Sequence, residues 1–220
     1  MKKAIIYFDR PGPQNTEKVI KAVKERIEKL GIKHVVVASE SGKTAIKVAK
    51  ALKKLNLNIV CVTAYAGVRS TYEKELGRSY YLSKERREEL KKLGVKVLEE
   101  SRWIFFGAAF DYAFLGDHAP STAIHRFISR VMGYGFKVAI EITLIAADVG
   151  AIPSEKEVVE IAGTGWVGGG ADCALVIKPS LVHRGRFLDP KKGLEVREII
   201  AIPRLKFSTW MEKNIRREKI

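Results

Sequence analysis

One short segment of the chain combines hydroxyl groups with an ammonium group: Ser39-Glu40-Ser41-Gly42-Lys43-Thr44, called here the serine turn. An apolar run at 35–37 precedes it and a helical pattern follows it, so the turn is predicted to join a strand to a helix. The first amides of a helix lack partners within the helix, and the helix dipole favours negative charge there. Together with the hydroxyls and the ammonium, these amides are suited to bind a phosphate. The alternative is an ordinary serine cap on an exposed helix.

The serine turn does not complete the phosphate-binding loop of P-loop nucleoside triphosphatases. That loop requires a glycine five positions before Gly42, and the residue at that position is Val37. A nucleoside triphosphatase is therefore not expected.

A second segment is rich in glycine: Gly163-Thr164-Gly165-Trp166-Val167-Gly168-Gly169-Gly170, called here the glycine loop. Its first three glycines have the spacing of a dinucleotide-binding fingerprint, but that fingerprint needs a helix directly after it. The next residues, 171–177, are apolar and strand-like, so a dinucleotide site is not expected. Two interpretations stay open: a flexible hairpin loop, or a backbone that approaches a ligand closely.

The surrounding pattern alternates strands with helices and predicts an α/β fold with a parallel sheet. The two cysteines, Cys61 and Cys173, fall within apolar strand-like runs and are expected to be reduced and buried. Residues 103–115 are left open between strand and packed loop, with an oligomer contact as a further option. Strands are predicted at 4–8, 35–37, 59–62, 95–98, 158–162, 171–177 and 199–202, and helices at 16–30, 43–55, 83–94, 121–132 and 136–149.

Two motifs resemble a known family. Ser39-x-Ser41-Gly42-Lys43-Thr44-Ala45 and Thr164-Gly165-Trp166-x-Gly168-Gly169-Gly170 resemble, in order and spacing, two loops of the C-terminal domain of pyruvate kinase, which hold the phosphates of a sugar-bisphosphate activator. The helix around 137–141 is also similar, and the resemblance extends from about residue 18 to residue 177. Stand-alone proteins built from this domain are more similar still, and flavin mononucleotide (FMN) fits as their ligand.

The resemblance implies a three-layer α/β/α sandwich whose mostly parallel sheet has an antiparallel last strand. No linker rich in Pro, Ser or Gly divides the sequence, so a single domain over residues 1–220 with a basic C-terminal tail is predicted. Pyruvate kinase performs its chemistry in a separate barrel domain, so kinase activity is not expected. The ligand would be held by Ser39, Ser41, Gly42, Lys43 and Thr44 in the serine turn and by Thr164, Gly165, Trp166, Gly168, Gly169 and Gly170 in the glycine loop.

One departure from the family bears on the ligand. The activator loop usually carries a basic residue directly after its tryptophan, whereas this chain has Val167. A ligand with one phosphate and an aromatic body, such as FMN, therefore suits the loop better than a sugar bisphosphate. The predicted function is binding or regulation by a phosphorylated small molecule, and the first alternative is an FMN-dependent enzyme of unknown substrate.

The charge of the chain suggests a second alternative. A formal net charge of +15 is compatible with an anionic partner such as nucleic acid, but no nucleic-acid recognition motif accompanies it. The charged surface equally fits a heat-adapted protein. No apolar run is long enough to cross a membrane, and residues 4–8 are too short for a signal peptide, so a cytoplasmic protein is expected, with a homo-oligomer left open.

Five other residues invite a chemical role. His118 and His125 lack a third metal ligand at a recognisable spacing, so no metal is expected. Glu141 and Asp148 lie seven residues apart on one predicted helix, which would allow paired acid and base chemistry, although salt bridges to lysines are the favoured role. Asp172 either receives a ligand hydroxyl or caps the glycine loop.

Overall fold

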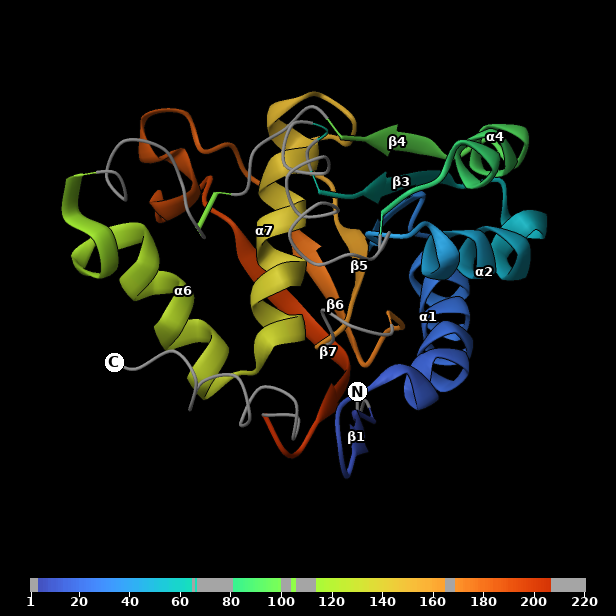
Figure 1. The fold of residues 1–220 in the computed structure, drawn as a ribbon, viewed down its shortest axis with the longest axis horizontal. Coiled ribbons are helices and arrows are strands. Elements are labelled where there is room, and N and C mark those ends of the chain that lie inside the picture. The colour runs from blue at the N-terminus through green and yellow to red at the C-terminus, as the bar shows by residue number, and fades with distance from the viewer. Residues whose placement is uncertain are drawn as a thin grey trace.

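The computed structural model describes residues 4–64, 66, 81–99, 104–105, 114–164 and 169–206. Within these ranges the strands form one sheet in the order β1-β7-β6-β5-β2-β3-β4 (Figure 1). The α/β class and the mostly parallel sheet predicted from the sequence are confirmed. The strands are β1 (Ile6–Phe8), β2 (His34–Ala38), β3 (Asn58–Val62), β4 (Lys96–Leu98), β5 (Val158–Ala162), β6 (Cys173–Lys178) and β7 (Glu195–Pro203).

The antiparallel strand of this sheet is β6, which follows the glycine loop as predicted. β6 runs antiparallel to both of its neighbours, β5 and β7, whereas the pairs β2–β3, β2–β5, β3–β4 and β1–β7 are parallel. β7 comes later in the chain and pairs with the other side of β6. β1 in turn pairs with β7 and forms the edge of the sheet. The strand after the glycine loop therefore lies inside the sheet, and all of its apolar positions are buried.

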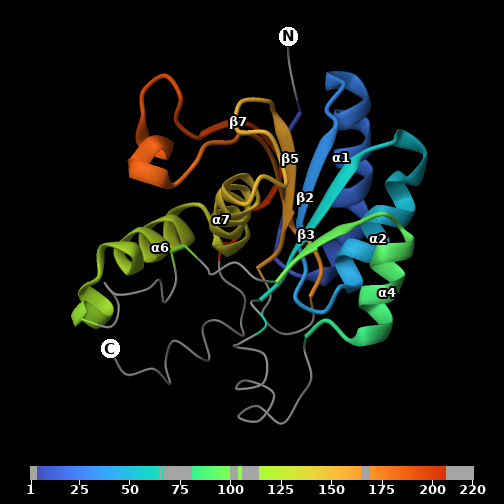
Figure 2. The ribbon, with the colours of Figure 1, turned by 90° about the horizontal axis from the view of Figure 1, so that it is seen from above.

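Helices cover both faces of the sheet, as Figure 2 shows. On one face lie α1 (Thr16–Leu30), α2 (Lys43–Leu52) and α4 (Lys84–Lys92). On the other face lies α7 (Tyr134–Asp148), with α6 (Pro120–Val131) packed against its outer side. The three-layer sandwich is thereby confirmed. The short 3-10 helices are η1 (Pro13–Asn15), η2 (Lys53–Leu55), η3 (Gly116–His118) and η4 (His183–Leu188).

Two hydrophobic cores separate these layers, and the side-chain alternation along a strand explains them. Val35 and Val37 point from β2 toward α1 and α2, whereas Val36 between them points toward α7. All three side chains are fully buried. A strand covered on both faces needs apolar residues at every position, which is why β2 appears in the sequence as a continuous run of valines.

Helix ends follow the local signals in most places. α1 has the predicted bounds and ends at Gly31, which adopts a left-handed φ of 67° and donates its amide to Ile27 O at 2.9 Å. Ser83 caps α4 by accepting a hydrogen bond from the Arg86 amide at 3.4 Å. The prediction for α2 was too long, because its last residues, 53–55, form the separate 3-10 helix η2.

The break between α6 and α7 is narrower than predicted. Tyr134 and Gly135 belong to α7, and the turn depends on Gly133, whose φ is 99°. Gly135 has no room for a side chain, because a Cβ there would lie 2.9 Å from both Asp172 Oδ1 and Cys173 Cβ. The segment left open at 103–115 falls mostly outside the described residues, and so does any oligomer contact within it.

α7 is the most buried helix of the described structure, and it contains an ion pair. Lys137 Nζ lies 2.9 Å from Glu141 Oε2, one turn further along the helix, and both side chains are at most 5% exposed. No helix in the described ranges combines the length and the apolar character that crossing a bilayer requires.

Cys61 on β3 and Cys173 on β6 are free and buried, as predicted. Burial raises the pKa of Cys61 to about 12, and the carboxylates of Glu40 and Glu99 add to the shift. Burial likewise raises the pKa of Cys173. Because the thiolate is the reactive form, we expect both thiols to react with iodoacetamide about a hundredfold more slowly in the native protein than in urea, as measured by mass spectrometry. Rapid alkylation of either cysteine in the native protein would contradict this expectation.

Candidate functional site

The candidate site lies at the carboxyl edge of the sheet. β2, β3, β4 and β5 are parallel, so their carboxyl ends meet at one edge, and β1 ends there too because it is parallel to β7, which runs opposite to β6. The serine turn follows β2 and the glycine loop follows β5, and these two strands are neighbours. Ligands of open α/β sheets bind at this edge, where the chain leaves adjacent strands in different directions.

In the serine turn, both serine hydroxyls accept hydrogen bonds from amides in the first turn of α2. The buried Ser39 Oγ accepts one from the Ala45 amide at 3.3 Å, and Ser41 Oγ accepts one from the Lys43 amide at 3.5 Å. The N-cap residue itself is Gly42, so neither serine is the simple N-cap that the sequence left as the alternative to phosphate binding. These bonds are compatible with phosphate binding, since a hydroxyl that accepts one hydrogen bond can still donate its own proton.

Position 42 has no room for a side chain, because the start of α4 lies against it. The φ of Gly42 is 79°, and a Cβ at this residue would lie 2.5 Å from Leu82 Cδ1 and 3.6 Å from Arg86 Cβ. The start of α2 therefore packs directly against the start of α4. This close approach brings residues into the candidate site that the local sequence of the serine turn does not indicate.

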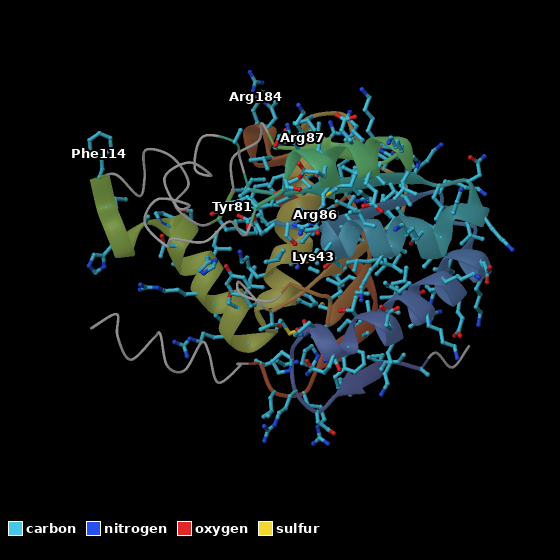
Figure 3. All side chains as sticks on the ribbon, turned by 45° about the vertical axis from the view of Figure 1, so that its right-hand side comes forward. Lys43, Tyr81, Arg86, Arg87, Phe114 and Arg184 are labelled. Atoms are coloured by element: carbon cyan, nitrogen blue, oxygen red, sulfur yellow. The ribbon has the colours of Figure 1, made fainter. Side chains whose placement is uncertain are left out.

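Arg86 is the main residue that sequence analysis missed. Arg86 Nη1 donates a hydrogen bond to Ser41 O at 3.1 Å, so a guanidinium lies beside the serine turn. Figure 3 labels its side chain next to that of Lys43, which is exposed and forms no ion pair with the described residues. In the sequence, Arg86 is one of several charges on a short helix, and only the packing of α4 on α2 distinguishes it.

The two predicted loops meet in the structure. The Gly170 amide donates a hydrogen bond to Thr44 Oγ1 at 3.1 Å, although these residues are 126 positions apart in the chain. A Cβ placed on Gly169 would lie 4.0 Å from the same Thr44 Oγ1. Of the predicted ligand residues in the glycine loop, Gly165, Trp166 and Gly168 lie outside the described residues.

Thr164, by contrast, lies in the interior and contacts Asp172. Its hydroxyl donates to Asp172 Oδ1 at 2.9 Å, and its amide donates to Asp172 Oδ2 at 3.1 Å. Burial raises the pKa of Asp172 to about 6, and the hydrogen bonds from Thr164 and Gly12 partly oppose this shift. Of the two roles considered for Asp172, capping of the glycine loop is the one that the structure contains.

The loop between β1 and α1 also reaches this edge, which was not predicted from the sequence. The Gly12 amide donates to Asp172 Oδ2 at 2.8 Å, and the Ala171 amide donates to Thr16 Oγ1 at 2.9 Å. The start of α1 thus touches the end of the glycine loop. No motif in residues 9–16 signals this contact, because it depends on β1 pairing with β7 at the far edge of the sheet.

Replacing Gly170 by Ala is expected to lower the free energy of unfolding by about 2–4 kcal/mol. The φ of Gly170 is 90°, and a Cβ there would lie 2.6 Å from Pro13 Cβ and 2.8 Å from Thr16 Oγ1. Gly31→Ala is the matched control, because Gly31 also has a positive φ but has nothing within 4 Å of a Cβ. Urea denaturation measures both variants, and equal losses would show that the close approach at Gly170 costs nothing.

The other candidate residues have structural partners. Glu141 pairs with Lys137 and accepts a hydrogen bond from the Phe105 amide at 2.7 Å, so the predicted salt bridge to a lysine is confirmed. Asp148 Oδ1 accepts one from the Val182 amide at 2.9 Å. Burial and the nearby Lys137 lower the pKa of His125 to about 4, despite the opposing effect of Glu141. The described residues contain no cluster of three potential metal ligands.

Comparison with known protein families agrees with this geometry. The profile of the pyruvate kinase alpha/beta domain matches residues 17–177, which is most of the chain. The match runs from the start of α1 through the serine turn and the glycine loop to β6, so it contains both loops that meet at the carboxyl edge. β1 and β7 lie outside the match and extend the sheet beyond β6. The chain therefore belongs to the pyruvate kinase alpha/beta domain family.

Proposed function

We propose that this protein binds a phosphorylated small molecule between the serine turn and the glycine loop, as a binding protein or regulatory module without kinase activity. One observation carries the proposal: the hydrogen bond from the Gly170 amide to Thr44 Oγ1, which holds a glycine-rich backbone against the start of a helix. Two features that each favour an anion are thereby within reach of one ligand.

The charges around this contact support a phosphate ligand. The start of α2 brings the positive end of its dipole to the serine turn, and the Arg86 guanidinium donates a hydrogen bond to Ser41 O in the same turn. Lys43, the first residue of α2, adds an exposed ammonium. Glu40, the one acidic residue of the turn, is directed toward the end of β3, where its Oε2 accepts a hydrogen bond from the Ala64 amide at 3.0 Å. The anion-binding groups are thus separated from the nearest carboxylate of the turn.

We propose FMN as the first ligand to test. Val167 replaces the basic residue that would hold a second phosphate, and Trp166 offers an aromatic surface for an isoalloxazine ring. An FMN-dependent enzyme would use the same site, and a purified protein with flavin absorbance would favour that alternative.

Isothermal titration with inorganic phosphate, FMN and a sugar bisphosphate tests the proposal. We expect FMN to bind, and Lys43→Ala and Arg86→Ala each to weaken binding by about tenfold to a hundredfold, since a charged hydrogen bond contributes about 1.5–3 kcal/mol. Lys47→Ala is the matched control: Lys47 lies one turn further along α2 and pairs with Glu17 at 2.8 Å. The proposal fails if no phosphorylated compound binds, or if Lys47→Ala weakens binding as much as Lys43→Ala does.

A further inference from the structure

Asp172, for which the sequence left two roles open, connects separate segments at the carboxyl edge. It lies just before β6 and is 1% exposed. Oδ2 accepts hydrogen bonds from the Gly12 and Thr164 amides, and Oδ1 accepts one from the Thr164 hydroxyl. One carboxylate therefore satisfies three donors from two loops.

These bonds hold the two ends of the glycine loop together. Thr164 stands near the beginning of the loop and Asp172 two residues after its end, so the contact between them closes the loop at its base. A closed loop has fewer conformations than an open one, and less conformational entropy is lost when a ligand fixes it. The hydrogen bond from the Gly12 amide to Asp172 also links the segment before α1 to the base of the glycine loop.

Further contacts link the base of the glycine loop to α2 and α7. From the end of the loop, the Ala171 amide donates to Thr16 Oγ1 and the Gly170 amide donates to Thr44 Oγ1. On the other side of the carboxylate, Gly135 in the first turn of α7 lies so close that a Cβ would stand 2.9 Å from Asp172 Oδ1. Asp172 is thus enclosed by the starts of α1 and α7 and by the base of the glycine loop.

We propose that Asp172 is a positioning residue for the ligand site: it holds the glycine loop against the start of α2 and makes the segment before α1 part of the site. This inference rests on the proposed function. Asp172 is buried and does not face the ligand, so it acts through Gly169 and Gly170, whose backbone approaches the serine turn. Without the carboxylate, the ligand itself must hold Gly169 and Gly170 against the serine turn, which lowers affinity while Lys43 and Arg86 remain in place.

The test compares ligand affinity with stability in variants of the full chain. We expect Asp172→Ala to weaken the binding of inorganic phosphate and FMN by about tenfold in titrations at a temperature where circular dichroism shows the variant to be folded. Asp172→Asn keeps one acceptor oxygen and should restore part of the affinity. Asp148→Ala is the matched control, because Asp148 also accepts a backbone amide but lies at the other end of α7.

The possible results separate this inference from the proposed function. If the wild-type chain binds none of inorganic phosphate, FMN and the sugar bisphosphate, the proposed function is wrong and the inference falls with it. If the wild-type chain binds and folded Asp172→Ala binds equally well, only the positioning role is wrong. Should Asp172→Ala not fold, Thr164→Val decides, since it removes a single donor: a loss of about threefold in affinity supports the role, and unchanged affinity overturns it.

Discussion

Replacing Glu141 by Gln is expected to lower the free energy of unfolding by about 3–5 kcal/mol. Glu141 pairs with Lys137 inside α7, where neither side chain reaches water. Burial alone would lower the pKa of Lys137, but Tyr134 and Glu141 raise it, and Lys137 Nζ lies 4.6 Å from the centre of the Tyr134 ring. Glutamine can still accept the Phe105 amide, so the loss comes from leaving the buried ammonium without its counter-charge. Urea denaturation measures the effect.

Two further variants show whether the loss comes from the unpaired charge. In a Glu141→Gln, Lys137→Met double variant both charges are gone, and most of the stability should return because a buried pair adds little over apolar packing. Glu17→Gln removes the acid of the exposed pair with Lys47 and should cost less than about 1 kcal/mol. A loss at Glu141 as small as the loss at Glu17 would show that the buried pair does not stabilise the fold.

The protein is also expected to lose stability as the pH rises because of Glu160. This residue lies on β5 with its side chain between the sheet and α7, and it is fully buried. Burial raises its pKa well above the usual value, and the nearby Thr143 hydroxyl only partly opposes the shift. That hydroxyl donates to Ala139 O at 2.8 Å, and neither carboxyl oxygen of Glu160 has a hydrogen-bond partner among the described residues.

The direction of the pH effect follows from the proton balance. Above the ordinary pKa of glutamate the unfolded chain has released this proton, while the folded chain keeps it up to the raised pKa. Over that interval the free energy of unfolding should fall by about 1.4 kcal/mol per pH unit, relative to a variant without the group. The contribution of protonated Glu160 to the free energy of unfolding is complete below the ordinary pKa of glutamate. It is lost as the pH rises from that value to the raised pKa of Glu160.

Glu160→Gln isolates this contribution. Urea denaturation of the wild-type chain and of the variant, between about pH 5 and pH 8, gives the difference in stability as a function of pH. We expect the free energy of unfolding of the variant to increase relative to that of the wild-type chain as the pH rises, because glutamine cannot ionise. Parallel curves would mean that Glu160 is ionised in the folded protein, or that it titrates as it does in the unfolded chain.

The helices and strands were predicted well where their signals are local. The strands β2 and β5 were found because a strand buried on both faces must be apolar throughout, and α1 was found from its apolar face and from Gly31. Differences arose at ends set by tertiary contacts. Gly135 was assigned to a turn, but it lies in α7 because the helix packs closely on Asp172. The single domain and the cytoplasmic location stay predictions.

The candidate site was predicted in part. The serine turn and the glycine loop were both identified, because their composition is unusual and their place after a strand is evident from the pattern. Arg86 was not found, because nothing in a short charged helix shows which arginine faces α2. Thr164 was predicted to touch the ligand, yet its hydroxyl donates to Asp172 in the interior.

The sequence by itself determined the layered α/β fold and the places of the serine turn and the glycine loop after their strands, since side-chain periodicity and turn chemistry act over a few residues. Only the tertiary structure decided that these loops meet, that Arg86 contacts the serine turn, and that Asp172 connects Gly12 to the glycine loop. The physical reason is that such contacts depend on the order of strands in the sheet. Gly170 and Thr44 are adjacent because β5 pairs with β2, and that pairing depends on the packing of the whole sheet with its helices.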